Sequence, residues 1–314
     1  MIRRPPRSTP SNSSAASDVY KRQSVNIVGG RPKNYKSTMA INIAVNLAVD
    51  YNIPVLYLDT EMSDNEQMSR ILSKLSGVSF YDIDTGNFSK SSTKMQKVKS
   101  ASKKFSASNL FYTDEVVGLD IYGICSIIKN WLYREVGIDE NGHAKQKCLV
   151  IYDYLKMTTG EKISFSMKEF QVIGEKLSYL KDMAKKYRFA AFVPVQLNRS
   201  ANEKIDDSVF AMSDRLAWFC DNISVIQFKP LGEILADGEN VGNYKLKPVS
   251  VRFGPGMDED DYINLHVYGD RSLITEGKTA RKVKLLEQRR KIRNDVKNRK
   301  TKNESRRDFE YSEQ

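Results

Sequence analysis

The residues whose types and spacing could do chemistry begin at Ser24, in the stretch SVNIVGGRPKNYKST. An apolar run, two glycines, a short turn and a Lys-Ser-Thr triplet lead into a helix-like pattern from Met39 to Val49. This is the layout of a phosphate-binding loop, in which backbone N–H groups of the turn and of the helix N-terminus point at phosphate oxygens. The predicted nucleotide-binding residues are Gly29, Gly30, Arg31, Pro32, Lys33, Asn34, Tyr35, Lys36, Ser37 and Thr38.

One position departs from the usual form of this loop, G-x-x-x-x-G-K-[ST]. Counted from Gly30, the second glycine falls on Tyr35. Glycine serves there because the backbone bends tightly, and a side chain at positive φ is strained. In such a loop Lys36 reaches the β- and γ-phosphates of ATP, and the Ser37 hydroxyl ligates Mg²⁺. The alternative is an ordinary strand–turn–helix with a surface lysine.

Two acidic residues follow apolar runs further along the chain. Cys148 to Tyr152 predicts a buried strand that ends in Asp153, as a Walker B acid is presented to Mg²⁺. Pro54 to Leu58 predicts another strand, and Glu61 lies on the loop that leaves it. A carboxylate at the ligand-binding edge of an α/β sheet can orient and deprotonate water. The alternative for Glu61 is a solvated acid that the dipole of the next helix favours.

The order of the remaining segments predicts the fold. Phe189 to Val195 indicates a strand that runs into Gln196, a polar residue placed to sense the γ-phosphate or, alternatively, to complete a turn. Helical patterns separate the strands, which predicts an α/β fold with a mainly parallel, twisted sheet covered by helices on both faces. Further helices are expected over 63–75, 120–136 and 167–187, a charged helix or loop over 89–104, and further strands over 222–228, 244–252 and 262–267.

Charge is distributed unevenly along the 314 residues. The chain has 50 Lys and Arg against 39 Asp and Glu, a net charge of +11, of which residues 1–23 contribute +4 and residues 278–314 contribute +8. Residues 24–277 therefore carry −1, so the overall basicity is no argument that the core binds nucleic acid. The basic tail 278–314 is predicted to be helical or disordered, either as a solvated charge run or as a DNA tether.

Cysteine and histidine usage excludes several classes of site. The 3 cysteines have no paired or metal-binding spacing, and 2 histidines are too few for a histidine-based metal site. No apolar run is long enough to span a membrane. The expectation is a reduced, cytoplasmic protein without a membrane partner.

The first 23 residues differ in kind from the rest. MIRRPPRST and SSAASDVYKRQ resemble translations of the two constant parts of a transposon-based sequencing-library adapter. We predict that residues 1–23 are a non-native, disordered segment and that the natural chain begins upstream of Ser24. The alternative is a natural basic arm rich in Pro and Ser. Residues 24–277 then form one domain, followed by the tail 278–314.

Six segments in order resemble the C-terminal ATPase domain of DnaB-type replicative helicases. They are GGRPKNYKST, LDTEMS, LVIYDYLK, PVQLNRS, MSDRLAWFCDNISVIQF and VRFGPG. The resemblance covers about residues 24–276, and the divergent loop is similar to bacteriophage versions. It implies a RecA-like fold, ATP and Mg²⁺ as cofactors, single-stranded DNA as substrate, and a homo-oligomer, expected to be a hexamer. A primase or helicase loader is an expected partner, and a phage protein would act in the host bacterial cytoplasm.

The resemblance also implies roles for individual residues. Glu61 takes the place of the catalytic glutamate, Asp153 of the Walker B acid and Gln196 of the γ-phosphate sensor. Arg252 matches an arginine finger that reaches the nucleotide of a neighbouring subunit. The implied DNA-binding residues lie on loops after the Walker B and sensor strands and are Lys162, Arg199 and Lys204.

The family usually has a lysine two residues before the arginine finger, and here that residue is Ser250. Lys247 could substitute only if the strand pairing shifts. Two other functions stay open: a RecA-like recombination or regulatory ATPase without unwinding, and a DNA-binding scaffold with a degenerate loop.

Overall fold

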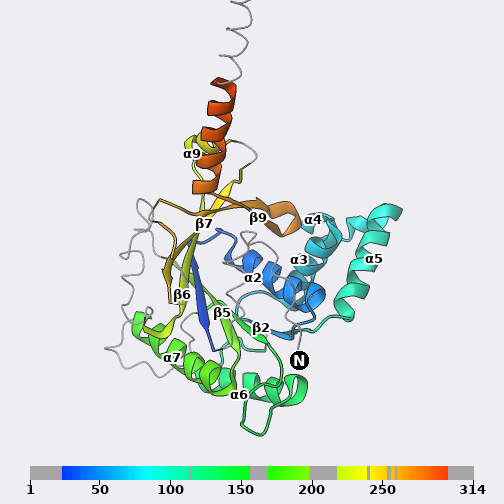
Figure 1. The fold of residues 1–314 in the computed structure, drawn as a ribbon. Helices are drawn as coiled ribbons and strands as arrows, with labels where there is room; N and C mark the ends of the chain where they lie inside the picture. Colours follow the sequence, from blue (N-terminus) through cyan, green and yellow to red (C-terminus); the bar gives the residue numbers. More distant parts are fainter. Residues whose placement is uncertain are drawn as a thin grey trace, which may run out of the picture.

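The computed structural model describes residues 23–113, 115–155, 169–197, 218–238, 241–252, 256–258 and 260–295. Within these residues one sheet forms the centre, with the strand order β3-β2-β4-β5-β1-β6-β7-β8-β9 (Figure 1). The strands are β1 Val25–Gly30, β2 Val55–Asp59, β3 Leu110–Thr113, β4 Leu149–Asp153, β5 Ala190–Gln196, β6 Asn222–Phe228, β7 Tyr244–Val251, β8 Ile263–Tyr268 and β9 Leu273–Thr279.

The sheet has a parallel part and an antiparallel part. All neighbours from β3 to β6 pair in parallel, whereas β6–β7, β7–β8 and β8–β9 pair antiparallel. Parallel neighbours need long crossovers, which the helices between them supply, and antiparallel neighbours need only short connections. The predicted α/β fold with a mainly parallel sheet is confirmed.

The helices lie on both faces of the sheet. They are α2 Lys36–Val45, α3 Asp64–Ser76, α4 Phe80–Asp84, α5 Ser92–Ser106, α6 Ile121–Trp131, α7 Glu169–Tyr187 and α9 Leu231–Asp237, with π-helical turns at Asn46–Asp50 and Leu132–Val136 and short 3₁₀ turns at Asn87–Lys90 and Gly269–Arg271. A further helix over 280–295 extends away from the sheet (Figure 1). In the part of the chain that the structure describes, no helix is both long and apolar enough to cross a membrane.

Two apolar cores flank the sheet because successive strand residues point to opposite faces. In β4, Val150 packs with α6 and α7, while its neighbour Ile151 packs with α2 and α3. Both residues are fully buried. Burial on both faces explains why the central strands read as continuous apolar runs in the sequence.

Four elements were not predicted from the sequence: α4, β3, α9 and β9. They are short or only partly buried, so their apolar pattern is weak. The uncertain segment 89–104 is largely helical, as α5, whose N-cap Ser91 accepts from the Lys94 N–H. The predicted boundary at 277/278 falls inside β9, and the buried Ala280 and Val283 fasten the helix that follows it to the core.

Candidate nucleotide-binding site

The carboxyl ends of four parallel strands meet at one edge of the sheet. Gly30 at the end of β1 pairs with Gln196 at the end of β5. Asp59 at the end of β2 pairs with Asp153 at the end of β4. The structure thus brings the predicted loop, sensor and Walker B residues to one edge, where open α/β sheets bind their ligands.

The loop between β1 and α2 has the backbone shape of an anion-binding turn. Lys33 has φ 67° and Tyr35 has φ 57°, both left-handed, and Tyr35 is the N-cap of α2. Alternation of right- and left-handed residues makes successive N–H groups converge on a concavity that attracts anions. The positive φ expected at the position of the usual glycine is therefore present at Tyr35.

The side chains of the loop point in two directions. The Lys36 ammonium donates to the carbonyl of Arg31, at 2.9 Å, across the mouth of the loop. Burial lowers the pKa of Lys36, while the carboxylates of Asp153 and Glu61 raise it in part. The Ser37 hydroxyl instead donates to Asp153 Oδ1, at 3.1 Å. The Lys36 ammonium and the pair of oxygens from Ser37 and Asp153 therefore lie next to each other.

The oxygens of Ser37 and Asp153 fit a magnesium ion. Mg²⁺ holds oxygen ligands at about 2.1 Å in an octahedron, so neighbouring ligands lie about 3 Å apart. The 3.1 Å between Ser37 Oγ and Asp153 Oδ1 matches that spacing. Hydroxyl and carboxylate oxygens are ligands that this ion prefers. The two residues could therefore hold Mg²⁺ together with phosphate oxygens and water.

Asp153 is a buried carboxylate with few compensating charges. It is 1% exposed, and burial raises its pKa to about 6, against the opposing hydrogen bond from the Tyr57 hydroxyl. Its nearest acid, Asp59, raises the pKa further. A desolvated carboxylate lacking a full counter-charge is suited to receive a cation.

Glu61 lies beside this site on a loop that Asp59 shapes. The Asp59 carboxylate accepts from the backbone N–H groups of Glu61 and Met62, each at 2.9 Å, and from the Gln67 amide at 3.1 Å. Glu61 itself is exposed and close enough to influence the pKa of Lys36. Asp59 thus fixes the backbone that carries the predicted catalytic carboxylate.

Sequence reasoning gave no role to Asp59 or Tyr57. Tyr57 reaches Asp153 because β2 pairs with β4. Asp59, in contrast, supports Glu61 through hydrogen bonds within its own loop. The one available signal was an Asp at the end of an apolar run, the same signal that identified Asp153.

Arg252 lies at the opposite end of the sheet. Its N–H donates to the carbonyl of Asp221 at 2.8 Å, just before β6 begins. The phosphate loop meets the other end of β6, where Asn34 Nδ2 lies 3.4 Å from the Ile226 carbonyl. Five residues of strand separate Asp221 from Ile226, roughly 16 Å at about 3.3 Å per residue. The structure therefore does not bring Arg252 to the phosphate loop of its own chain.

The Arg252 side chain is largely exposed and forms a long ion pair with Asp221. Its Nη1 lies 3.5 Å from Asp221 Oδ1, and it is 59% exposed, whereas the Asp221 side chain is 1% exposed. Asp221 is engaged more firmly, since it accepts from the Val25 N–H at 2.8 Å and pairs with Lys181. Arg252 is thus tethered at its backbone, with a guanidinium open to solvent.

The pairing of β7 with β6 does shift next to Arg252. Ser250 faces Ile223 but Pro248 faces Ser224, so the intervening Val249 forms a bulge. Beyond this bulge Lys247 faces Val225, which places it on the same side of the sheet as Ser250. The shift in strand pairing that Lys247 would need in order to replace the missing lysine is therefore present in the backbone.

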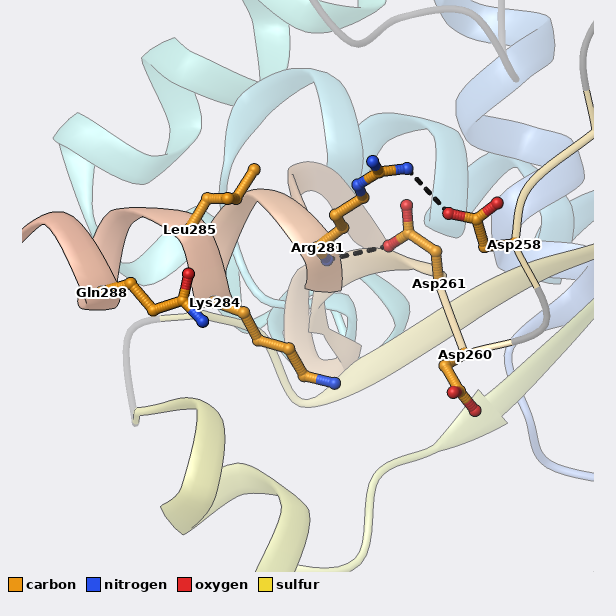
Figure 2. Close-up of a pocket in the computed structure, with 7 residues that line it drawn as sticks. All are labelled: Asp258, Asp260, Asp261, Arg281, Lys284, Leu285 and Gln288. Atoms are coloured by element: carbon orange, nitrogen blue, oxygen red, sulfur yellow. Dashed lines mark hydrogen bonds and ion pairs between the residues drawn. The ribbon is translucent and has the colours of Figure 1, made fainter.

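The predicted DNA-binding residues Lys162, Arg199 and Lys204 fall outside the residues that the structure describes. A cavity of about 340 Å³ lies between Asp258, Asp260 and Asp261 and the helix over 280–295. Arg281 pairs with Asp258 there at 2.7 Å (Figure 2). None of the predicted site residues lines this cavity; its lining residues are Asp258, Asp260, Asp261, Arg281, Lys284, Leu285 and Gln288.

Comparison with known proteins connects this geometry to a family. Residues 16–215 match the DnaB-like helicase C terminal domain. The match begins inside the segment predicted to be non-native, and that assignment stays a prediction.

Two curated relatives are replicative helicases by name. The "Probable replicative DNA helicase" of Trieres chinensis is 25% identical over 187 residues, which are 59% of this chain and 38% of that protein. The "Replicative DNA helicase DnaB" of Buchnera aphidicola subsp. Baizongia pistaciae is 29% identical over 180 residues, 57% of this chain and 36% of that protein. The chain thus spans little more than a third of the length of these relatives.

A solved structure supports the fold. A DnaB-like replicative helicase, described with its interactions with primase, superimposes with a TM-score of 0.67 and 19% identity, over 82% of this chain and 58% of that chain. At this identity the likeness shows the RecA-like architecture alone. Together with the family match over most of the chain, the nucleotide edge identifies the protein as a member of the DnaB-like helicase C-terminal domain family.

Proposed function

We propose that this chain is the ATP-driven motor of a DnaB-like replicative DNA helicase. One observation carries the proposal: the left-handed phosphate loop, Lys36 and the Ser37–Asp153 pair lie together at one edge of the sheet. Membership of the helicase family supports DNA unwinding as the purpose of ATP hydrolysis.

Each residue of this edge has a distinct task in hydrolysis. Lys36 binds the β- and γ-phosphates, and Ser37 and Asp153 hold Mg²⁺, which neutralises phosphate charge. Glu61, on the loop that Asp59 fixes, orients the attacking water and accepts its proton. Gln196, level with Gly30, contacts the γ-phosphate and reports its loss to the loop that follows β5.

We propose that the catalytic site is completed by a second copy of the chain. Arg252 cannot reach its own phosphate loop along β6, so its exposed guanidinium serves the nucleotide of a neighbour. Such head-to-tail contacts close into rings, and we propose a hexamer. Stabilisation of phosphoryl-transfer charge by an arginine in trans accelerates hydrolysis by about 10³–10⁵ in related systems.

Single-stranded DNA is the proposed substrate of the assembled ring. Lys162, Arg199 and Lys204 are the proposed phosphate contacts, so binding falls steeply as salt rises. Primase or a helicase loader is the proposed protein partner; the solved relative that interacts with primase supports the first. A phage-encoded protein acting in the cytoplasm of its bacterial host fits these assignments.

The proposal is tested by ATP hydrolysis with and without single-stranded DNA. We expect DNA to stimulate hydrolysis in the parent chain, and both Lys36→Ala and Glu61→Gln to abolish it. Glu61→Gln should still bind nucleotide, since only the proton acceptor is lost, whereas Lys36→Ala should bind weakly. Hydrolysis that survives Glu61→Gln would refute the assignment of the base. DNA binding without hydrolysis in any variant would favour the scaffold, and stimulated hydrolysis with strand pairing but no unwinding would favour a recombination ATPase.

A further inference from the structure

The phosphate loop contains a tyrosine in a conformation that favours glycine. Tyr35 has φ 57° and ψ 28° and directly precedes the first residue of α2. A residue with a Cβ is strained in this left-handed region, so the surrounding structure must compensate for it. The compensation is visible in what the tyrosine ring touches.

The ring lies against the backbone of Gly269, at the start of the 3₁₀ turn Gly269–Arg271 between β8 and β9. A Cβ built on Gly269 would come within 2.9 Å of the Tyr35 Cζ, and closer still to its hydroxyl oxygen. Gly269 is not among the glycines with positive φ, so it is not required by its own backbone conformation. A glycine is needed at position 269 because Tyr35 occupies the space of a side chain.

A second aromatic residue holds the ring from the side. Tyr244, at the start of β7, meets Tyr35 edge to face, with ring centroids 5.5 Å apart and planes at 89°. Tyr244 in turn packs against Phe228 at the end of β6, at 5.4 Å. Offset and edge-to-face pairs of this kind add stabilisation beyond the burial of their surface.

The helix behind the loop is fastened to the same turn. Asn42, in α2, donates to the carbonyl of Ser272 at 2.8 Å and accepts from the Ile274 N–H at 3.1 Å. Tyr35 therefore holds the phosphate loop, and Asn42 holds α2, against the turn between β8 and β9. The turn between β8 and β9 thus supports the phosphate loop from outside.

The tyrosine leaves the nucleotide edge free. Lys36 and Ser37 contact Arg31 and Asp153, on the side of the loop toward β4. Tyr35 leans the other way, toward β7 and the β8–β9 turn, which lie beyond β6 in the sheet. Its ring therefore stabilises the loop without filling the space for phosphates.

We propose that Tyr35 is a positioning residue for nucleotide binding: seated on Gly269 and Tyr244, it locks the phosphate loop in its binding shape before the nucleotide arrives. This inference rests on the proposed function. The sequence suggests the opposite, because glycine is the usual residue at this position and a side chain at positive φ is strained. Preorganisation of this kind improves affinity by lowering the cost of ordering the loop.

The test measures the affinity of fluorescent ADP with Mg²⁺ for the full chain and a set of variants. We expect Tyr35→Gly and Gly269→Ala each to weaken binding about tenfold, and Tyr35→Phe to bind within about twofold of the parent. The double variant Tyr35→Gly/Gly269→Ala should be no weaker than the weaker single variant, because both remove one contact. Gly232→Ala, whose new Cβ would meet no atom within 4 Å, is the matched control.

A second readout requires no nucleotide. Amide hydrogen exchange of residues 31–38 in the free chain should be faster in Tyr35→Gly and Gly269→Ala than in the parent and the control, because the loop is no longer locked. Parent-like exchange and affinity in Tyr35→Gly, or in Gly269→Ala, would overturn the inference. Failure of the proposed function looks different: ADP would then bind the parent and Lys36→Ala equally, whatever residue 35 is.

Discussion

Charged side chains at the two opposite edges of the parallel sheet, Asp153 at the end of β4 and Arg252 near the start of β6, have very different surroundings. At the nucleotide edge, Asp153 is 1% exposed and accepts from Ser37 and Tyr57, so its position is fixed within the chain. At the opposite edge, the Arg252 side chain is 59% exposed, and its Nη1 lies 3.5 Å from Asp221 Oδ1. One charged group is buried and the other is largely exposed to solvent.

This difference is what we expect if, as proposed, the catalytic site is divided between subunits. Side chains that must be precisely placed when nucleotide binds are buried and hydrogen-bonded, which restricts their rotamers. A side chain that reaches into a neighbour's site is instead held through its backbone, while its charged end extends into solvent. The variants below change either Arg252 or residues at and around the nucleotide edge, and each is expected to leave the other region largely unchanged.

The largest expected effect belongs to Arg252→Ala. In the assembled ring it should reduce DNA-stimulated ATP hydrolysis by about 10³-fold or more, because the charge developing on the phosphates loses its partner. Affinity for ADP should stay within about threefold, since the nucleotide edge of each chain is intact. Parallel turnover and binding assays check this. A similar loss in both would contradict the separation of the two regions.

Asp153→Asn should change stability with pH. In the nucleotide-free chain burial raises the pKa of Asp153 from 3.8 to about 6, so the folded state binds more protons than the unfolded state between these values. The contribution of this group to the free energy of unfolding therefore falls as pH rises from about 4 to 6, by on the order of 3 kcal/mol.

The asparagine variant removes that loss because it carries no charge. It should be more stable than the parent at pH 7 and approach the parent at pH 4, measured by denaturant unfolding without nucleotide and Mg²⁺. Equal pH slopes in the two proteins would show that Asp153 is not destabilised by burial. Asp82→Asn is the control, because the hydrogen bond from Lys94 lowers the pKa of that partly buried carboxyl instead of raising it.

Asp59→Ala should affect turnover more than binding. It removes the acceptor of the Glu61 and Met62 N–H groups, and hydrogen bonds to a charged group contribute about 1.5–3 kcal/mol each. We expect kcat to fall about tenfold while KM for ATP stays nearly unchanged, because Glu61 loses its position but the phosphate loop does not. An increase in KM alone would instead place Asp59 in nucleotide binding.

The smallest effect is expected from Ser63→Ala. The Ser63 hydroxyl caps α3 by accepting from the Glu66 N–H at 3.4 Å, directly after the loop that carries Glu61. Loss of such a cap costs about 1 kcal/mol of stability. The matched variant Ser91→Ala removes the N-cap of α5, which is distant in sequence from the residues of the nucleotide edge. Both should unfold slightly earlier, and only Ser63→Ala should lower turnover.

The sequence was informative where a residue's role depends on its own segment. The apolar runs before Gly29 and Asp153 predicted two central strands, because strands buried on both faces leave an uninterrupted apolar signal. Helix α3 was recognisable from its capping residues Ser63 and Glu66. The parallel part of the sheet and its binding edge could therefore be predicted.

Roles that depend on distant partners could not be predicted. Tyr35 packs against Gly269, which lies more than two hundred residues later in the chain. The sequence near either residue gives no sign of this contact. The bulge at Val249 appears only when β7 pairs with β6. Likewise, the opposite placement of Arg252 and the phosphate loop follows from the antiparallel direction of β7, which an apolar pattern does not specify.

The most direct test of a site shared between subunits is to mix two inactive variants. Lys36→Ala has a defective phosphate loop but an intact Arg252, and Arg252→Ala has the reverse. Each alone should hydrolyse almost no ATP, but in an equal mixture about a quarter of head-to-tail interfaces combine an intact loop with an intact arginine. We predict that mixing restores about that fraction of parental DNA-stimulated hydrolysis. Co-assembly of the two variants without recovered hydrolysis would contradict the account that Arg252 completes a neighbour's site.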